Sequence, residues 1–459
     1  MIFEQHYLDC LSQASYLIAD ETTKRAVVVD PRRDVSPYLE TAEEHGLAIE
    51  LVIETHFHAD FLSGHLELAE ATGAAIAYGS VAETEFESRK LADGERISLG
   101  QVELEVRHTP GHTPESISIV VYDLAESPEP WGVLTGDTLF IGDVGRPDLQ
   151  SSKGVTSEEL ASDLYDSLHT KLMSLPDATR LWPGHGAGSS CGKNLSTNTS
   201  CSIGVQRETN YAVADMTKDE FIEVVTTGQT APPAYFGFDA VLNRELRPIL
   251  DEHQAPAPLE LDEVLRLQSA GAVVLDTRGP EVFATGHLVG SVNIGLGGRY
   301  AEFAGGVLLP DTDIVLVGEP GTELEAKVRL ARIGFDRVVG HLVDPERSLA
   351  GAPEHVGQSS RFDVAAMVDA MATVDGLQVL DVRQPGETEG GVVEGAVLIP
   401  LTRLRADMGS LDRDRPVAVY CAGGFRSSIA ASLMKLHGFD DVTDLLGGWG
   451  AWTAAHTPA

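Results

Sequence analysis

The stretch Thr55-His56-Phe57-His58-Ala59-Asp60-Phe61 decides the fold of the first half of the chain. It overlaps the end of the apolar run Leu51–Thr55 (LVIET), which is typical of a buried strand, so its polar side chains stand where a strand passes into a loop. Strand and helix patterns alternate around it, with strands expected at Ala26–Asp30 (AVVVD) and Gln101–Val106 (QVELEV) and a helix at Leu62–Thr72. This alternation predicts a layered α/β domain.

Three further polar signals also follow strand patterns: Pro110-Gly111-His112-Thr113, Thr135-Gly136-Asp137-Thr138 and Trp182-Pro183-Gly184-His185-Gly186. Imidazole and carboxylate ligands suit a divalent transition metal. Two histidines and one carboxylate on one face leave open positions for O₂ and substrate, as at non-haem Fe(II) centres. We therefore predict that His56, His112 and Asp137 bind one metal ion.

The order and spacing of these signals resemble the metallo-β-lactamase superfamily, whose signature is H-x-H-x-D-H. In that family the last histidine of the signature helps to hold a second metal, and here the position is Phe61. Phenylalanine has no lone pair to offer, so we expect one metal rather than two. His58, Asp60 and His185 are then expected to hydrogen-bond the ligands, a bound water or the substrate sulfur, with weak binding of a second zinc as the alternative.

Within that superfamily, residues 1–247 resemble the persulfide dioxygenases, a branch with a single iron. The resemblance is carried by His56–Asp60, His112–Ser116, Gly136–Leu149 and His185–Ser189. It implies an αββα sandwich, one Fe(II) per chain, and a thiol persulfide whose outer sulfur takes up O₂ and leaves as sulfite. It also implies that Arg146 and Asp148 lie near the active site as candidate substrate-binding residues, although a structural ion pair between them is the alternative.

The second half of the chain contains an internal repeat. Asp276–Ile294 (DTRGPEVFATGHLVGSVNI) and Asp381–Ile399 (DVRQPGETEGGVVEGAVLI) match at seven positions without a gap. Each copy continues into an apolar strand pattern, a turn and a helical pattern, which predicts two further α/β domains. Linkers are expected at Asp251–Pro258 and Val343–Ser360. The predicted domains are residues 1–250, 258–345 and 360–459.

In the second copy, a strand pattern ends at Cys421 within Val417–Arg426 (VAVYCAGGFR). A thiol just before a helix N-terminus faces unpaired backbone N–H groups, which together with Arg426 favour thiolate and persulfide anions. The segment resembles the rhodanese active-site loop, C-x-x-G-x-R, and its C-x4-R spacing is tighter than the C-x5-R cradle of rhodanese-fold phosphatases. This implies sulfane-sulfur transfer at Cys421. The equivalent turn of the first copy, Val317–Thr322, has neither cysteine nor arginine and predicts a pseudo-rhodanese domain.

The composition restricts the partners. The chain has 70 acidic and 33 basic residues, a formal net charge of −37 that repels nucleic acid and anionic membrane surfaces. The start of the sequence has no secretory signal pattern and no apolar run has transmembrane length, so we expect a cytoplasmic protein with free thiols. Cys10, Cys191 and Cys201 are expected to be ordinary small residues, with Cys201 as a candidate accessory persulfide carrier. The oligomeric state stays open, and a homo-oligomer is allowed.

Over its whole length the chain resembles the dioxygenase–pseudo-rhodanese–rhodanese fusions of sulfide detoxification. This implies that sulfite made at the iron centre accepts a sulfur from Cys421 and leaves as thiosulfate. Two other hypotheses stay open: a glyoxalase II-like thioesterase or lactonase with two zinc ions, and a sulfur-carrier or sensing module that passes persulfide to a partner protein. Phe61 disfavours the two-zinc hydrolase, and steady O₂ uptake with a small-molecule persulfide would exclude the carrier as the main role.

Overall fold

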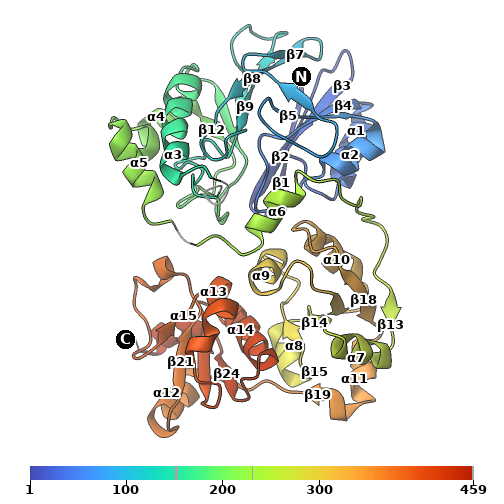
Figure 1. The fold of residues 1–459 in the computed structure, drawn as a ribbon, viewed down its shortest axis with the longest axis vertical. Helices are drawn as coiled ribbons and strands as arrows, with labels where there is room; N and C mark the ends of the chain where they lie inside the picture. Colours follow the sequence, from blue (N-terminus) through green and yellow to red (C-terminus); the bar gives the residue numbers. More distant parts are fainter. Residues whose placement is uncertain (150–153, 230, 457–459) are drawn as a thin grey trace. The chain divides into compact units, whose positions relative to one another are not determined.

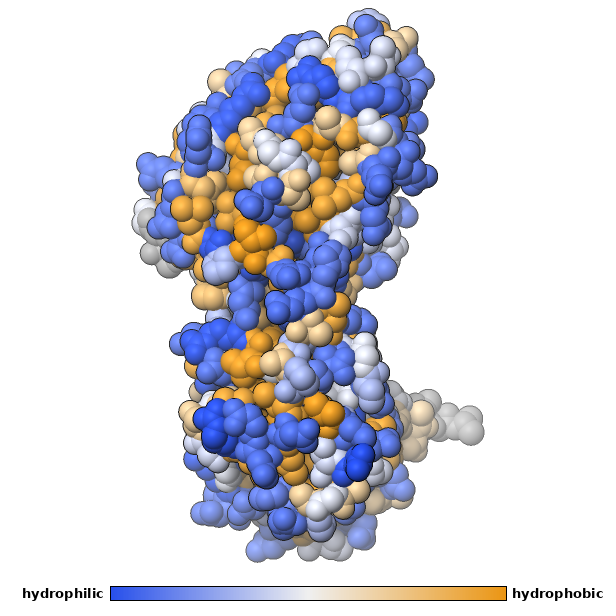
Figure 2. Space-filling model, turned by 90° about the vertical axis from the view of Figure 1, so that its right-hand side faces the viewer, coloured by the Kyte–Doolittle hydropathy of each residue, from blue (hydrophilic) through white to orange (hydrophobic). Residues whose placement is uncertain are grey.

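The structure, a computed structural model, describes residues 1–149, 154–229 and 231–456. Its contacts divide the chain into two compact units, Met1–Asp251 with Ala331–Gly334, and Glu252–Leu330 with Phe335–Ala459. Among the described residues, no helix has the length and apolar character needed to cross a membrane. Hydrophilic residues cover much of the face shown in Figure 2, with apolar residues between them, as the acidic excess of the sequence leads one to expect.

The first unit consists of two six-stranded sheets with helices on their outer faces (Figure 1). One sheet has the strand order β1 (Ile2–Leu8), β2 (Gln13–Ala19), β3 (Arg25–Val29), β4 (Ala48–Ile53), β5 (Ala75–Gly79), β6 (Arg89–Leu91). The other has the order β12 (Cys201–Ser202), β11 (Arg180–Pro183), β10 (Gly132–Gly136), β9 (Ile117–Asp123), β8 (Val102–His108), β7 (Arg96–Ser98). This arrangement confirms the predicted αββα sandwich.

The helices of the first unit cover both sheets. Helices α1 (Ser36–His45) and α2 (His65–Thr72) pack on the first sheet. The second sheet is covered by α3 (Ser157–Asp166), which continues into a π-helical turn, and by α4 (Ile203–Thr209) and α5 (Lys218–Thr226). The short α6 (Phe236–Leu242) comes later in the chain. The predicted helix at Leu62–Thr72 is confirmed from His65 onward, and Gly73 ends it in a left-handed conformation with φ +74°.

The apolar core between the sheets explains the strand patterns of the sequence. Strands β3, β4, β9 and β10 are buried on both faces, one against the opposite sheet and one against the helices, so they need long apolar runs. Strand β8 buries one face, which is why its sequence alternates. The residues that face the opposite sheet include Val27, Val29, Leu51, Ile53, Leu104, Val106, Ile119 and Leu134. The polar signals of the sequence therefore lie just outside this core, at the ends of its strands.

The second unit contains two five-stranded parallel sheets with the same strand order. The first is β13 (Pro258–Leu259), β18 (Val338–Leu342), β17 (Ile314–Val317), β14 (Val273–Asp276), β16 (Val292–Asn293). The second is β20 (Arg361–Phe362), β24 (Val442–Leu445), β23 (Val417–Tyr420), β21 (Gln378–Asp381), β22 (Val397–Leu398). Asp276 pairs with Val317 and Asp381 pairs with Tyr420, so the strand register repeats as the sequence does.

Among the described residues, five α-helices belong to the first copy of the repeat and the segment that follows it, and four belong to the second copy. Those of the first are α7 (Leu261–Ser269), α8 (Pro280–Thr285), α9 (Tyr300–Val307), α10 (Glu323–Ala331) and α11 (Pro345–Ala350). Those of the second are α12 (Val364–Thr373), α13 (Leu401–Asp407), α14 (Phe425–Leu436) and α15 (Gly448–His456). The copies touch where Ser428 Oγ donates to Asn293 Oδ1 at 3.0 Å and Asn293 N donates to Ser432 Oγ at 2.9 Å.

A buried ion pair explains the repeated Asp-x-Arg of the two copies. Arg278 Nη2 lies 2.6 Å from Asp276 Oδ2, and Arg383 Nη2 lies 2.6 Å from Asp381 Oδ2. Each arginine also donates to the carbonyl of a repeated glycine, Gly286 in the first copy and Gly391 in the second. The pair therefore ties the loop after β14 or β21 to the end of its strand.

The expectation of a linker at Val343–Ser360 was wrong for most of that stretch. Pro345 begins helix α11, where its missing N–H costs no hydrogen bond. Farther on, β19 (Val356–Gly357) pairs antiparallel with β15 (His287–Leu288). The Gly, Pro and Ser content of this stretch suggested a linker. Composition alone does not show that the segment forms a helix and pairs with β15.

We expect Arg383→Gln to lower the stability of the second unit by about 3–5 kcal/mol, because it leaves the fully buried Asp381 carboxylate without its partner. Thermal or urea unfolding of the full chain measures the change. Arg403→Gln is the matched control, since it removes an exposed pair with Asp407 on α13 and should cost under about 1 kcal/mol. Equal losses in the two variants would contradict this account.

Candidate functional site

Three predicted metal ligands lie together at strand ends of the first unit. His56 follows β4, His112 lies in the loop between β8 and β9, and Asp137 follows β10. Asp137 Oδ2 is 3.9 Å from His56 Nε2 and 3.6 Å from His112 Nε2. All three side chains are buried, and their candidate ligand atoms lie within 4.8 Å of one another. Both sheets of the sandwich therefore contribute to one compact cluster.

The chemistry of the cluster fits a divalent cation. Within the described part of the chain, His56 Nε2 and both carboxylate oxygens of Asp137 are buried without a hydrogen-bond partner. Such atoms destabilise a fold unless something binds them. Burial and the neighbouring imidazoles lower the pKa of His56 well below its usual value, which keeps its Nε2 lone pair available. A metal ion would satisfy these atoms together.

The remaining ring nitrogens of the two histidines are held by neighbours. Thr55 Oγ1 donates to Asp30 Oδ2 at 2.8 Å and so accepts the Nδ1–H of His56 at 2.9 Å. The Nδ1–H of His112 donates to the backbone carbonyl of Arg146 at 2.9 Å. With Nδ1 protonated in both rings, each Nε2 is the lone-pair atom that faces the cluster.

His58, Asp60 and His185 form a second buried group, with ligand atoms within 4.8 Å of one another. His185 Nε2 lies 3.3 Å from Asp60 Oδ2 and 3.6 Å from Asp137 Oδ1, so this group adjoins the first. His58 Nε2 faces Asp30 at 3.1 Å and Glu54 at 3.3 Å. Burial acts to lower the pKa of His58, but these carboxylates outweigh it and raise the pKa well above its usual value.

Phe61 occupies the position of the missing histidine. Its buried ring lies with its centre 4.3 Å from the ring of His58 and 6.4 Å from that of His185. It places hydrocarbon against the second group where a metal ligand would otherwise stand. The second group therefore has three candidate donors of its own and adjoins Asp137, and Phe61 adds none.

Asn243 holds the metal-motif loop, although no sequence pattern pointed to it. Its side-chain nitrogen donates to the carbonyls of His58 and Phe61 at 2.8 and 2.9 Å, and its oxygen accepts from Ser63 N. Asn243 follows α6, 182 residues beyond Phe61, and no local pattern marks it. It fixes the turn that carries His58 and Asp60.

Cys191 also lies at the cluster, which sequence analysis did not anticipate. It is buried, and its sulfur lies within 4.8 Å of the ligand atoms of Asp137 and His185. Burial and the carboxylates of Asp60 and Asp137 raise the pKa of the thiol well above its usual value. Cys201 is half-buried on β12, where Gln206 donates to its sulfur at 3.2 Å.

Arg146 and Asp148 pair with each other. Arg146 Nε and Nη2 each donate to one carboxylate oxygen of Asp148 at 2.7 Å. The Arg146 side chain is buried, and its backbone carbonyl fixes His112. These contacts place the pair beside a predicted metal ligand.

Cys421 directly follows β23, in the loop that leads to α14. Gly424 N donates to its sulfur at 3.1 Å, and Gly424 has φ +94° directly before α14. A Cβ on Gly448 would stand 2.2 Å from the carbonyl oxygen of Cys421, so the start of α15 approaches this loop as only glycine permits. Trp449 N donates to that same carbonyl oxygen at 2.7 Å.

Arg426 lies on the first turn of α14 and pairs with Glu387. Its Nη1 and Nη2 each donate to one oxygen of the carboxylate at 2.6 Å. The hydrogen bonds from this guanidinium lower the pKa of Glu387. In the first copy, Gly318 stands at the strand end where the second copy has Cys421.

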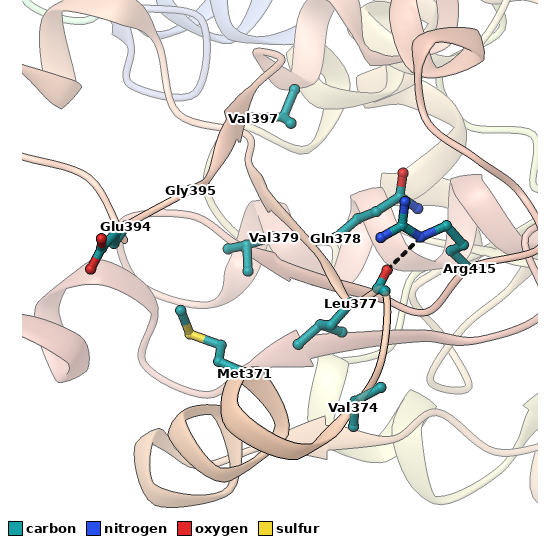
Figure 3. A pocket seen from close by; sticks show the side chains of 10 residues that line it. Met371, Val374, Leu377, Gln378, Val379, Glu394, Gly395, Val397 and Arg415 are labelled. Atoms are coloured by element: carbon teal, nitrogen blue, oxygen red, sulfur yellow. Dashed lines mark hydrogen bonds between the residues drawn. The ribbon is translucent and has the colours of Figure 1, made fainter.

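A cavity of about 450 Å³ lies elsewhere in the second copy, lined by residues such as Met371, Leu377, Val379, Glu394 and Arg415 (Figure 3). Gln378, the first residue of β21, also lines it. Cys421 follows the opposite end of the sheet, since β21 and β23 run parallel and Gln378 pairs with Val417. The cavity is therefore separate from the Cys421 loop.

Family models match both parts of the chain. The metallo-β-lactamase superfamily matches residues 8–185, and the rhodanese-like domain matches residues 260–343 and 364–455. The human protein named persulfide dioxygenase ETHE1, mitochondrial, is 31% identical over 175 residues, which are 37% of this chain and 63% of that protein. The cytoplasmic hydroxyacylglutathione hydrolase of Arabidopsis thaliana is 34% identical over 182 residues, which are 39% of this chain and 66% of that protein.

The chain thus spans less than two thirds of the length of these two curated relatives. Among solved structures, a metallo-β-lactamase from Staphylococcus aureus subsp. aureus COL is similar with a TM-score of 0.67 and 34% identity. That match covers 74% of this chain and 98% of the other. The chain belongs to the metallo-β-lactamase superfamily, and two rhodanese-like domains follow its metallo-β-lactamase domain.

Proposed function

We propose that the chain is a persulfide dioxygenase with sulfurtransferase activity. In this proposal a thiol persulfide, O₂ and water give the thiol and sulfite at His56, His112 and Asp137. The observation that carries it is the pairing of this buried two-histidine, one-carboxylate cluster with Phe61 at the adjoining second group. Similarity alone does not choose between functions, because a relative named as a dioxygenase and one named as a hydrolase are about equally identical to the chain.

The residues around the cluster prepare it for this chemistry. Fe(II) bound there would supply the activation of O₂ that the oxidation of sulfur requires. Thr55 and the carbonyl of Arg146 hold the imidazoles in one tautomer, and the burial of the cluster excludes bulk water. Asp60 and His185, which lie next to Asp137, are placed to hold a proton or the persulfide beside it.

Cys421 supplies the second half-reaction. The Cys421 thiolate first attacks the outer sulfur of a second thiol persulfide, whose S–S bond breaks, and the thiol leaves with the electron pair. The lone pair of sulfite then attacks the outer sulfur of the Cys421 persulfide, the S–S bond to Cys421 breaks, and its electron pair returns to the cysteine as thiolate. The products are thiosulfate and free Cys421, so this step needs no external oxidant. Gly424 N, which donates to the sulfur, stabilises the thiolate that leaves. Joining both sites in one chain raises the local concentration of sulfite at Cys421.

The metal and the oxygen requirement test the dioxygenase directly. We expect about one iron per chain and O₂ uptake with a low-molecular-weight persulfide, with sulfite or thiosulfate as the product. Metal analysis and an oxygen electrode measure these, and chelation of the metal should abolish the uptake. A chain that binds about two zinc ions and hydrolyses a thioester without consuming O₂ would instead be the hydrolase.

Phe61→His tests why a single metal is expected. The new imidazole would join Asp60 and His185 as a metal ligand. When the chain is supplied with zinc, its metal content should therefore rise from about one to about two ions per chain, and persulfide-dependent O₂ uptake should fall. Phe61→Leu is the control, because leucine has no donor atom and should keep one ion. Unchanged metal content in Phe61→His would show that the ring does not set the metal number.

Cys421→Ser tests the coupling of the two reactions. We expect O₂ uptake to continue while the product changes from thiosulfate to sulfite, since a serine oxygen cannot carry the sulfane sulfur. Ion chromatography of the products measures the ratio. Cys201→Ser, which removes a thiol outside both sites, is expected to keep thiosulfate as the product. Thiosulfate formed at the normal rate by Cys421→Ser would rule out the coupling.

A further inference from the structure

The guanidinium of Arg426 is already occupied in the structure. Both of its terminal nitrogens donate to the Glu387 carboxylate at 2.6 Å, with Arg426 19% and Glu387 37% exposed. Arginine also binds oxyanions through a bidentate pair of hydrogen bonds of this kind. Glu387 therefore holds the donors that a sulfur oxyanion at Cys421 would use.

The first copy of the repeat shows that the fold does not need this pair. The gapless repeat places Val282 at the position of Glu387, and the matching strand register places Glu323 at that of Arg426. Both copies nevertheless build the same five-stranded order and the same buried Asp–Arg pair. The Arg426–Glu387 pair occurs in the copy that has Cys421, which links it to the sulfur loop rather than to folding.

We propose that Glu387 gates the oxyanion site at Cys421: its carboxylate occupies Arg426 and must give way before a sulfur oxyanion such as sulfite or thiosulfate can bind. The gate rests on the proposed sulfur transfer. It sets the concentration of oxyanion at which Cys421 begins to react, because the incoming anion and the Glu387 carboxylate compete for one guanidinium. Glu387 is 37% exposed, so it can turn into water when the anion replaces it. Its Oε2 also accepts from Gln384 N at 2.9 Å, and the turn breaks that bond as well.

Thiosulfate and cyanide probe this site without the iron centre. The Cys421 thiolate attacks the outer sulfur of thiosulfate, the S–S bond of thiosulfate breaks, and sulfite leaves with its electron pair. Cyanide then takes that sulfur from the Cys421 persulfide as thiocyanate, which restores the thiolate. Because thiosulfate is the only oxyanion that must enter, its half-saturating concentration reports on Arg426.

The experiment compares Glu387→Gln with wild type in the full chain. We expect the half-saturating thiosulfate concentration to fall about threefold, in the range of an exposed ion pair, while the maximal rate changes little. Glu389→Gln is the matched control: it removes the same charge two residues away, from a side chain that is exposed and not part of the Arg426 pair, and it should behave as wild type. A fall in both variants would indicate a general charge effect and would overturn the gate.

A double-mutant cycle gives the second test. In an Arg426→Ala background, Glu387→Gln should no longer change the half-saturating concentration, because no guanidinium remains to be released. An unchanged or higher half-saturating concentration in Glu387→Gln alone would overturn the gate and make Glu387 a residue that orients Arg426. A wild-type chain that forms no thiocyanate would overturn the proposed sulfur transfer itself.

Discussion

The constraint on which the first unit depends is the burial of His56, His112 and Asp137, in which His56 Nε2 and both Asp137 oxygens have no hydrogen-bond partner in the described part of the chain. Each buried polar atom without a partner costs about 1–3 kcal/mol, so the cluster would destabilise the sandwich unless a cation binds it. The fold places these atoms together because strands from both sheets end at one place. A metal bound there would therefore couple its binding to folding, and the hydrogen bonds that fix the outer ring nitrogens would serve both.

Much of this centre could be predicted because its residues lie in the loops that follow strand patterns. Hydrophobic periodicity locates the end of a strand, and the residue type that follows then suggests a metal ligand. His56, His112 and Asp137 could therefore be grouped from the sequence alone. Asn243 and Cys191 could not, because their contacts depend on how distant loops return to the site. Asn243 reaches the motif loop from 182 residues away, and a single asparagine after a short helix has no pattern of its own.

In the second unit, too, the features with a local sequence pattern could be predicted and the long-range contacts could not. The repeated Asp-x-Arg and its glycines predicted two similar domains because the same ion pair recurs inside each. The pairing of Arg426 with Glu387 was not predictable, since it joins residues 39 positions apart and the first copy has no counterpart. The prediction of a linker at Val343–Ser360 was wrong for a related reason. Its composition is typical of a linker, but β19 within it pairs with β15, and composition does not reveal such a pairing.

The contact between Asn293 and α14 bears on how the duplicated halves evolve. Asn293 belongs to the copy without a nucleophile, yet it binds Ser428 and Ser432 on the helix that carries Arg426. A substitution at Asn293 in the first copy would thus disturb α14, the helix that follows the Cys421 loop of the second copy. Because the two copies share these hydrogen bonds, neither can change at this contact without a matching change in the other.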